Sequence, residues 1–180
     1  MIKFEKVSFE QFEKDMKKCT SLVTPDAIYD AYESIEIPTR GTEGSAGYDI
    51  SIPYEFNIEP YSKSMMLPTG LRIILEDQLE LNIHPRSSIG IKKDLLISNT
   101  IPVIDTDYHL ADNEGHIMLV LRNMGPNQFI NEQEGNKWKP IVQGVITKYY
   151  LVDNDVPREL KRVGGIGSTD TGRTGYMSVC

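Results

Sequence analysis

Apolar residues recur at helical spacing only at the start of the chain. Ser8 and Gln11 have the spacing of a capping box, which predicts that a helix begins there. The apolar positions that follow at helical spacing are Phe9, Phe12, Met16 and Cys19. Together these residues predict an amphipathic helix over residues 8–19. Thr24 before Pro25 predicts the start of a second, short helix, because threonine caps helices and proline fits their first turn.

The pattern changes from Ile35 onward, where short alternating or β-branched runs predict strands. Gly, Pro, Asn or Asp interrupts these runs about every eight to twelve residues, a spacing typical of an all-β sandwich or barrel. The predicted strands are 48–52, 63–67, 71–75, 79–84, 117–122 and 142–151. No run between Arg40 and Leu151 indicates a helix, and the polar segment 123–140 predicts a long loop or a hairpin. We therefore expect an all-β domain with a short N-terminal helical appendage.

Length, charge and hydropathy limit the class of protein. A chain of 180 residues is long enough for one domain with its own core. The net charge of −7 argues against binding to nucleic acid, which needs clustered cations. No apolar run approaches the roughly 18 residues of a membrane span, and the first residues lack the apolar core of a secretory signal. We expect a soluble, cytoplasmic protein that binds neither membranes nor nucleic acid.

The cysteines and histidines form no recognisable catalytic or metal-binding pattern. Cys19 and Cys180 lie near opposite ends of the chain, and neither has a cysteine or histidine at metal-ligand spacing. A nucleophilic cysteine needs a basic partner, and the three histidines show no pairing with either thiol. We expect two free thiols and no cysteine catalysis.

Three kinds of side-chain chemistry gather between residues 81 and 108. Arg86 and the hydroxyls of Ser87 and Ser88 come at the end of an alternating run. A planar guanidinium beside hydroxyls suits phosphate oxygens, although such a run is also typical of a solvated turn. Asp105 comes directly after two apolar residues, so we expect it at a bend where water is partly excluded. A carboxylate there can act as a base, and ordinary turn chemistry is the alternative.

Glycines and hydroxyls are concentrated between residues 161 and 169, behind two cations. One interpretation is a terminal tail without a function, because chain ends are often not tied to the fold. The other is a phosphate-binding segment in which successive backbone N–H groups and Arg162 contact phosphate. Such a segment could close over a ligand and exclude water.

Five short motifs, in this order, make the chain resemble the trimeric dUTP nucleotidohydrolases (dUTPases). The motifs are residues 46–50, 85–90, 104–108 preceded by Asn99, a segment that ends in Gln143, and 162–169. The likeness covers about residues 35–175, and the spacing of Ser87 and Asp105 fits the family's usual separation of its second and third motifs. Five ordered motifs are far more specific than any one of them.

The resemblance implies a fold, an assembly and a reaction. The fold is a β jelly-roll, and the assembly is a homotrimer whose active sites are each built from more than one chain. The reaction is hydrolysis of dUTP to dUMP and pyrophosphate, with Asp105 as the general base that directs water at the α-phosphorus. Mg²⁺ bridges the phosphates and is contacted by Asp49 through water.

The resemblance also assigns contacts with the substrate. Tyr108 packs under the deoxyribose and leaves no room for a 2′-hydroxyl. Asn99 and the backbone around Val103 and Ile104 bind the uracil edge. The residues assigned to the phosphates or to the attacking water are Arg86, Ser87, Ser88, Gln143, Arg162, Gly167 and Ser168.

The sequence departs from the family's pattern at several positions. Ile166 stands where a phenylalanine usually stacks on the base, so it covers uracil without an aromatic stack. Pro140 replaces the arginine that usually precedes the glutamine of the fourth motif. Arg162 stands one residue closer to the glycine pair than usual, which makes Arg173 or the preceding lysine an alternative cation. A short insertion, residues 109–114, follows the third motif.

Two other functions stand beside hydrolysis. A dCTP deaminase shares the Arg-Ser-Ser motif, but this chain has Val120 where that family carries a proton-shuttling glutamate. A nucleotide-responsive regulator would bind dUTP in the same site and a protein partner through the N-terminal helices or the insertion. We expect residues 1–34 to form the helical appendage, residues 35–160 the β domain, and residues 161–180 an arm that closes the active site.

Overall fold

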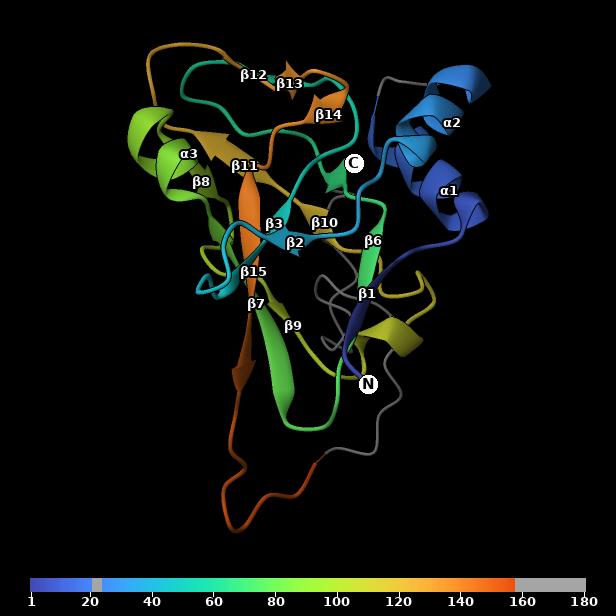
Figure 1. The fold of residues 1–180 in the computed structure, drawn as a ribbon, viewed down its shortest axis with the longest axis vertical. Helices are drawn as coiled ribbons and strands as arrows, with labels where there is room; N and C mark the ends of the chain where they lie inside the picture. Colours follow the sequence, from blue (N-terminus) through green and yellow to red (C-terminus); the bar gives the residue numbers. More distant parts are fainter. Residues whose placement is uncertain (21–23, 158–180) are drawn as a thin grey trace, which may run out of the picture.

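The computed structural model describes residues 1–20 and 24–157 (Figure 1). The helices are α1 (Phe9–Cys19), α2 (Pro25–Glu33), α3 (Ser87–Lys92) and the 3₁₀ helix η1 (Tyr108–Leu110). The strands are β1 (Lys3–Lys6), β2 (Thr39–Arg40), β3 (Gly47–Ile50), β4 (Asn57–Ile58), β5 (Leu67–Pro68), β6 (Leu71–Ile74), β7 (Leu79–Pro85), β8 (Leu95–Ile97), β9 (Val103–Ile104), β10 (Met118–Leu119), β11 (Leu121–Asn123), β12 (Phe129–Ile130), β13 (Gln133–Glu134), β14 (Lys137–Trp138) and β15 (Val142–Lys148).

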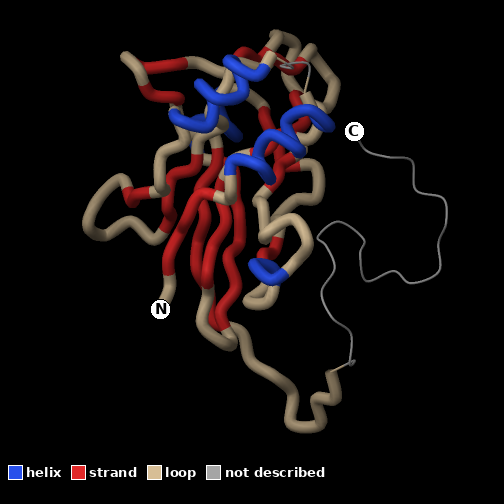
Figure 2. The backbone as a smooth tube through the Cα atoms, turned by 90° about the vertical axis from the view of Figure 1, so that its right-hand side faces the viewer, coloured by secondary structure: helices blue, strands red, loops and turns tan. Residues whose placement is uncertain are grey.

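A five-stranded antiparallel sheet, in the order β2-β3-β15-β7-β9, positions most of the candidate residues. The long strands run through the middle of the molecule, and α1 and α2 lie together at one end (Figure 2). Residues that are directly opposite in neighbouring strands share a face of the sheet. Ile50 and Val142 are such a pair on the core face, each 1% exposed. The next row, Asp49, Gln143 and His84, therefore lies on the opposite face.

The two N-terminal helices predicted from the sequence are present. Ser8 caps α1, because its Oγ accepts the N–H of Gln11 at 3.1 Å. Thr24 caps α2 by accepting the N–H of Ala27. The reciprocal half of the capping box is not made, since the N–H of Ser8 donates to Glu114 (2.8 Å) and the side chain of Gln11 donates to Asp15 (2.7 Å). In the described part of the chain, no helix is long and apolar enough to cross a membrane.

Both helices pack into the same core as the sheet. Phe12 and Met16 of α1 and Ile28 of α2 each have 0% exposure, and they form one cluster with Leu81 and Ile83 of β7. β1 pairs with β6 and ties the start of the chain to the strands. Burial of one such side chain contributes about 1.5–3 kcal/mol. The N-terminal segment is therefore an integral part of the hydrophobic core.

α3 contradicts the expectation that no helix lies between Arg40 and Leu151. The carbonyl of Arg86 accepts the N–H groups of Ile89 and Gly90, both at 2.9 Å, and so starts the helix. With 6 residues, α3 is too short to show a helical period in the sequence. It depends on its position between β7 and β8 rather than on its own propensity.

The strand predictions are confirmed for four of the six segments and wrong in part for the other two, and predicted strands 48–52 and 142–151 correspond to β3 and β15. Predicted strands 71–75 and 79–84 correspond to β6 and β7, whereas 63–67 forms a single bridge from Lys63 to Arg122 and the start of β5. The predicted strand 117–122 is divided into β10 and β11, and the polar segment contains the hairpin β13–β14. β1, β8 and β9 were not predicted, because two to four residues cannot show alternation.

Candidate active site

Arg86 lies where β7 ends and α3 begins, and the neighbouring strands hold its guanidinium. Its Nε is 3.0 Å from Oδ1 of Asp49 in β3. Its Nη1 donates to the carbonyl oxygen of Pro140, just before β15 (3.3 Å). The side chain is still 37% exposed, so part of the guanidinium remains open to an anion. Ser87 and Ser88 follow it, and both are exposed. The structure thus brings the predicted phosphate-binding run together with Asp49.

Gln143 of β15 lies between Asp49 of β3 and His84 of β7 in the register of the sheet. Its amide occupies space that Gly47 leaves open. A Cβ at position 47 would overlap Oε1 of Gln143 and lie 3.0 Å from its Cδ. The structure therefore places Gln143 beside the Arg86–Asp49 pair. Sequence reasoning did not identify the space that Gly47 leaves for Gln143, because it depends on the strand register.

β9 is the last strand of the main sheet, and Asp105 begins the turn that follows it. The N–H of Tyr108 donates to the carbonyl of Asp105 at 3.1 Å and closes this turn. Within it, Oγ1 of Thr106 donates to the carbonyl of Leu79 in β7 at 2.8 Å. Asp105 is partly buried, which agrees with the bend predicted from the sequence.

Tyr108 is fixed through its hydroxyl group. The residue is 7% exposed. Its hydroxyl donates to the carbonyl of His116 (3.1 Å) and accepts the side-chain amide of Asn113 (2.9 Å). Both partners lie within or just after the insertion 109–114, so this insertion supports the aromatic ring. The sequence did not predict that Asn113 and His116 contact Tyr108, because the spacing of these residues does not show that the chain folds back onto the tyrosine.

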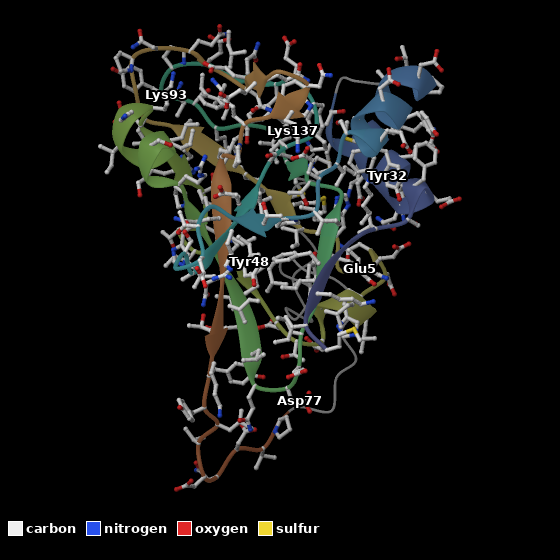
Figure 3. The ribbon with its side chains drawn as sticks, in the orientation of Figure 1. Glu5, Tyr32, Tyr48, Asp77, Lys93 and Lys137 are labelled. Atoms are coloured by element: carbon white, nitrogen blue, oxygen red, sulfur yellow. The ribbon has the colours of Figure 1, made fainter. Side chains whose placement is uncertain are left out.

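The predicted residues form two groups at opposite ends of β7. Leu81 pairs with Ile104, next to Asp105, whereas Arg86 comes five residues after Leu81. At about 3.3 Å per strand residue, the two groups are about 17 Å apart. In Figure 3, the labelled Asp77 lies near the start of β7, and the labelled Lys93 lies beyond its other end, just after α3. One chain therefore does not bring Asp105 and Arg86 together.

The remaining predicted residues lie at the edge of the described structure or beyond it. Asn99 is exposed in the turn between β8 and β9, next to Thr100, whose φ is 63°. The site residues predicted in the C-terminal arm lie outside the described residues; they are Arg162, Ile166, Gly167 and Ser168. Within residues 1–20 and 24–157, no three His, Cys, Asp or Glu side chains converge in a way that could hold a metal ion.

Comparison with known sequences identifies the family. A sequence model described as dUTPase matches residues 33–169. The deoxyuridine 5'-triphosphate nucleotidohydrolase of Lactococcus lactis is 38% identical over 137 residues, which are 75% of this chain and 88% of that protein. The protein of the same name from Wolinella succinogenes is 30% identical over 160 residues, which are 87% of this chain and 95% of that protein.

Solved structures agree with this result. The dUTPase of Streptococcus mutans has a TM-score of 0.61 at 28% identity and covers 84% of this chain and 98% of its own. A Staphylococcus bacteriophage 80alpha dUTPase solved with dUPNHPP has a TM-score of 0.60 at 18% identity, a likeness of fold that covers 94% of this chain and 98% of its own. These neighbours and the many strands confirm the predicted all-β fold class.

The sequence matches define a class of enzyme, the nucleotidohydrolases that act on deoxyuridine triphosphate. The chain belongs to the dUTPase family. Its activity is that of a dUTP diphosphatase, which hydrolyses dUTP to dUMP.

Proposed function

We propose that Asp105 is the general base of this hydrolysis. Its carboxylate takes a proton from water, the water oxygen attacks the α-phosphorus, and the bond from that phosphorus to the α–β bridging oxygen breaks. The products are dUMP and pyrophosphate. The observation that supports this role is the fixed turn after β9, which holds Asp105 close to Tyr108. General-base help typically contributes roughly 10²- to 10⁴-fold in rate.

β9 and its flanking turns recognise the deoxyuridine. Because β9 is the last strand of the sheet, one of its edges has no strand partner in the described structure. Backbone groups of Val103 on that edge, and of the turn that follows Ile104, bind uracil, and the exposed amide of Asn99 adds to them. Tyr108 packs under the sugar. A site that pairs its polar groups with one base rejects analogues that leave those groups unpaired.

The triphosphate binds at the Arg86 end of the site. Arg86, Ser87 and Ser88 contact phosphate oxygens, and Gln143 orients the attacking water or a phosphate. From the family resemblance, the C-terminal arm completes the contacts. In that arm Arg162, Gly167 and Ser168 hold the outer phosphates, and Ile166 covers the base.

The residues of the site fit a Mg²⁺ ion that arrives with the triphosphate. Asp49 is the carboxylate beside Arg86, and the described residues offer no cluster of three ligands that could enclose the ion. Asp49 would hold such an ion through water, and the ion would keep several of its own waters, as a hard cation of this kind usually does. When bound, Mg²⁺ neutralises charge on the phosphates.

Each active site is shared between copies of the chain. Within one chain, Asp105 and Arg86 are about 17 Å apart along β7, too far to act on the same phosphate. A homotrimer in which Asp105 of one copy faces Arg86 of another completes the site. The arm of residues 161–180 then closes the active site.

Pyrophosphate release from different nucleotides tests this function. We expect rapid release from dUTP with Mg²⁺, little release from UTP, dTTP or dCTP, and a large loss of rate when the metal is chelated. Ammonia release from dCTP would support the deaminase instead. Equal rates with dUTP and dTTP would contradict the proposed recognition of uracil.

A further inference from the structure

A buried hydrogen bond joins α1 to the segment that supports Tyr108. His116 has 0% exposure, and its Nδ1 lies 2.6 Å from Oδ2 of Asp15 in α1. Its Nε2 accepts the N–H of Gly70 at 2.8 Å. Because Nε2 is an acceptor, the ring proton is on Nδ1 and is donated to Asp15. A neutral imidazole therefore satisfies both contacts.

Asp15 is ionised and held in place inside the protein. It is 6% exposed, and Nε2 of Gln11 donates to the same carboxylate oxygen at 2.7 Å. Burial raises the pKa of Asp15, but the hydrogen bonds from His116 and Gln11 outweigh burial and leave this pKa below its ordinary value of 3.8. The carboxylate is therefore a permanent acceptor for the imidazole at neutral pH.

The link from α1 continues to the active site through the main chain. The carbonyl of His116 accepts the hydroxyl of Tyr108 at 3.1 Å. A second contact lies two residues earlier, where Glu114 accepts the N–H of Ser8 at 2.8 Å and the hydroxyl of Ser8 at 2.6 Å. α1 thus holds both the end of the insertion and the residue that anchors Tyr108.

We propose that Asp15 is a positioning residue for the discrimination between deoxyribose and ribose. This inference rests on the proposed function, in which Tyr108 packs under the sugar. Asp15 fixes the imidazole of His116, which fixes the carbonyl that holds the Tyr108 hydroxyl. An aromatic ring that cannot tilt leaves no room for a 2′-hydroxyl. Asp15 lies before residue 33, where the family match begins, so the matched part of the chain does not include this support.

Loss of Asp15 should loosen the Tyr108 ring. The buried N–H of His116 loses its acceptor, and a buried donor without an acceptor drives local rearrangement. Since a misplacement of about 1 Å can cost roughly 100-fold in rate, we expect Asp15→Ala to lower the ratio of kcat/KM for dUTP to that for UTP by about 10-fold or more. A smaller folded fraction lowers both values equally, so the ratio reports the position of the ring.

The test measures this ratio in wild type and three variants. Asp15→Ala should lower it, whereas Asp15→Asn, which keeps an oxygen that can accept from His116, should restore most of it. Ile28→Ala is the stability control, because it removes an apolar side chain with 0% exposure from α2. It should lower the Tm and leave the ratio unchanged. An unchanged ratio in folded Asp15→Ala would overturn the inference.

A fourth variant, Gln11→Ala, keeps the test possible if Asp15→Ala does not fold. Gln11→Ala removes the other donor to Asp15, and we expect the same change with a smaller size, about 3-fold. An unchanged ratio there also overturns the inference. A wild-type enzyme without preference for dUTP over UTP would instead contradict the proposed function. A preference that Tyr108→Ala abolishes but Asp15→Ala keeps would contradict the role of Asp15 alone.

Discussion

Arg86 is oriented by contacts with its neighbours in the chain. Asp49 holds its Nε and the carbonyl of Pro140 holds its Nη1. A partly exposed ion pair of this kind stabilises a fold by only about 0–1 kcal/mol. Asp49 therefore contributes more to the direction of the guanidinium than to stability. A side chain that is already ordered loses less freedom when it binds a ligand.

Asp105→Asn tests the base directly. The amide keeps the shape of the carboxylate but not its basicity, so we expect dUTP binding close to that of wild type and a fall in kcat of roughly 10²- to 10⁴-fold. Calorimetric binding and pyrophosphate release measure the two effects separately. Asp112→Asn, at an exposed position in the insertion, is the control and should keep full activity. A near-wild-type kcat for Asp105→Asn would count against the base assignment.

Gly47→Ala tests the support of Gln143. A Cβ at position 47 meets the amide of Gln143, so the amide must move, and we expect kcat/KM for dUTP to fall by about 10- to 100-fold. Gly44→Ala is a matched control, because a Cβ there meets nothing within 4 Å. If both variants keep wild-type kcat/KM, Gln143 does not act from its observed position.

The sequence indicated candidate side chains for phosphate and base chemistry, but it did not indicate the residues that support them. Arg86 and Asp105 stand in motifs whose residue types suit phosphate and base chemistry. The sequence did not indicate that the carbonyl of Pro140 contacts Arg86, because this contact depends on the strand register. Nor did it indicate that Asn113 and His116 contact Tyr108, because this requires the chain to fold back after the insertion. No local spacing in the sequence records those contacts.

At the scale of elements, α1 and the insertion are tied by charge as well as packing. Burial opposes ionisation of Glu114, but the hydrogen bonds from Ser8 and the nearby Arg72 leave the pKa of Glu114 below its ordinary 4.5. A carboxyl whose pKa is lower in the folded state stabilises the fold above its unfolded pKa. That contribution is lost as the pH falls through the folded-state value. The contact between α1 and the insertion should therefore weaken in acid.

Glu114→Gln should reveal this pH dependence. At pH 7 we expect the variant to have a Tm about 2–4 °C lower, the shift that about 1 kcal/mol causes in a domain of this size. The difference should shrink as the pH falls below the ordinary value of 4.5 and through the lower folded-state pKa of Glu114, where the wild-type carboxyl also becomes neutral. Thermal unfolding followed by circular dichroism gives both values. Glu13→Gln, which breaks an exposed contact with Lys17, should change the Tm little at either pH. A difference that persists at pH 3 would contradict the charge argument.

The packing of α1 and α2 also determines how a partner-binding role can be tested. Removal of residues 1–34 would take the buried Phe12 and Ile28 out of the core, so it cannot separate partner binding from folding. Tyr29 is 53% exposed on α2, and Tyr29→Ala leaves the core intact. We expect this variant to hydrolyse dUTP at the wild-type rate in the pyrophosphate assay. A large loss of rate would show that this face of α2 supports the active site.

Elements with clear caps or long alternation were predictable, and short ones were not. α1 and α2 have caps that the sequence displays, and β7 and β15 are long enough to alternate. α3 and β9 have 6 and 2 residues, and they exist because neighbouring strands hold them. Both flank β7 and carry candidate residues, so the local structure of the site was the part least visible in the sequence.

At the scale of the molecule, β7 separates the two halves of the candidate site. Asp105 and Tyr108 lie near its start, and Arg86 follows its end. The all-β class was predictable from the pattern of short runs. The separation of the two halves was not, because it depends on the pairing of β9 with β7. Within one chain, Asp105 and Arg86 lie about 17 Å apart. An active site shared between two copies, as proposed above, would bring these two residues together.

Complementation between two inactive variants tests the shared site most directly. Asp105→Asn and Arg86→Ala should each be nearly inactive alone, and co-expression with two different affinity tags allows isolation of mixed oligomers. In a closed ring of three, each mixed trimer of either composition has one site in three with both residues intact, so we expect about a third of wild-type kcat. The double variant mixed with wild type carries the same mutations and is the matched control. Mixed oligomers that remain as inactive as the single variants would contradict a site built from Asp105 of one copy and Arg86 of another.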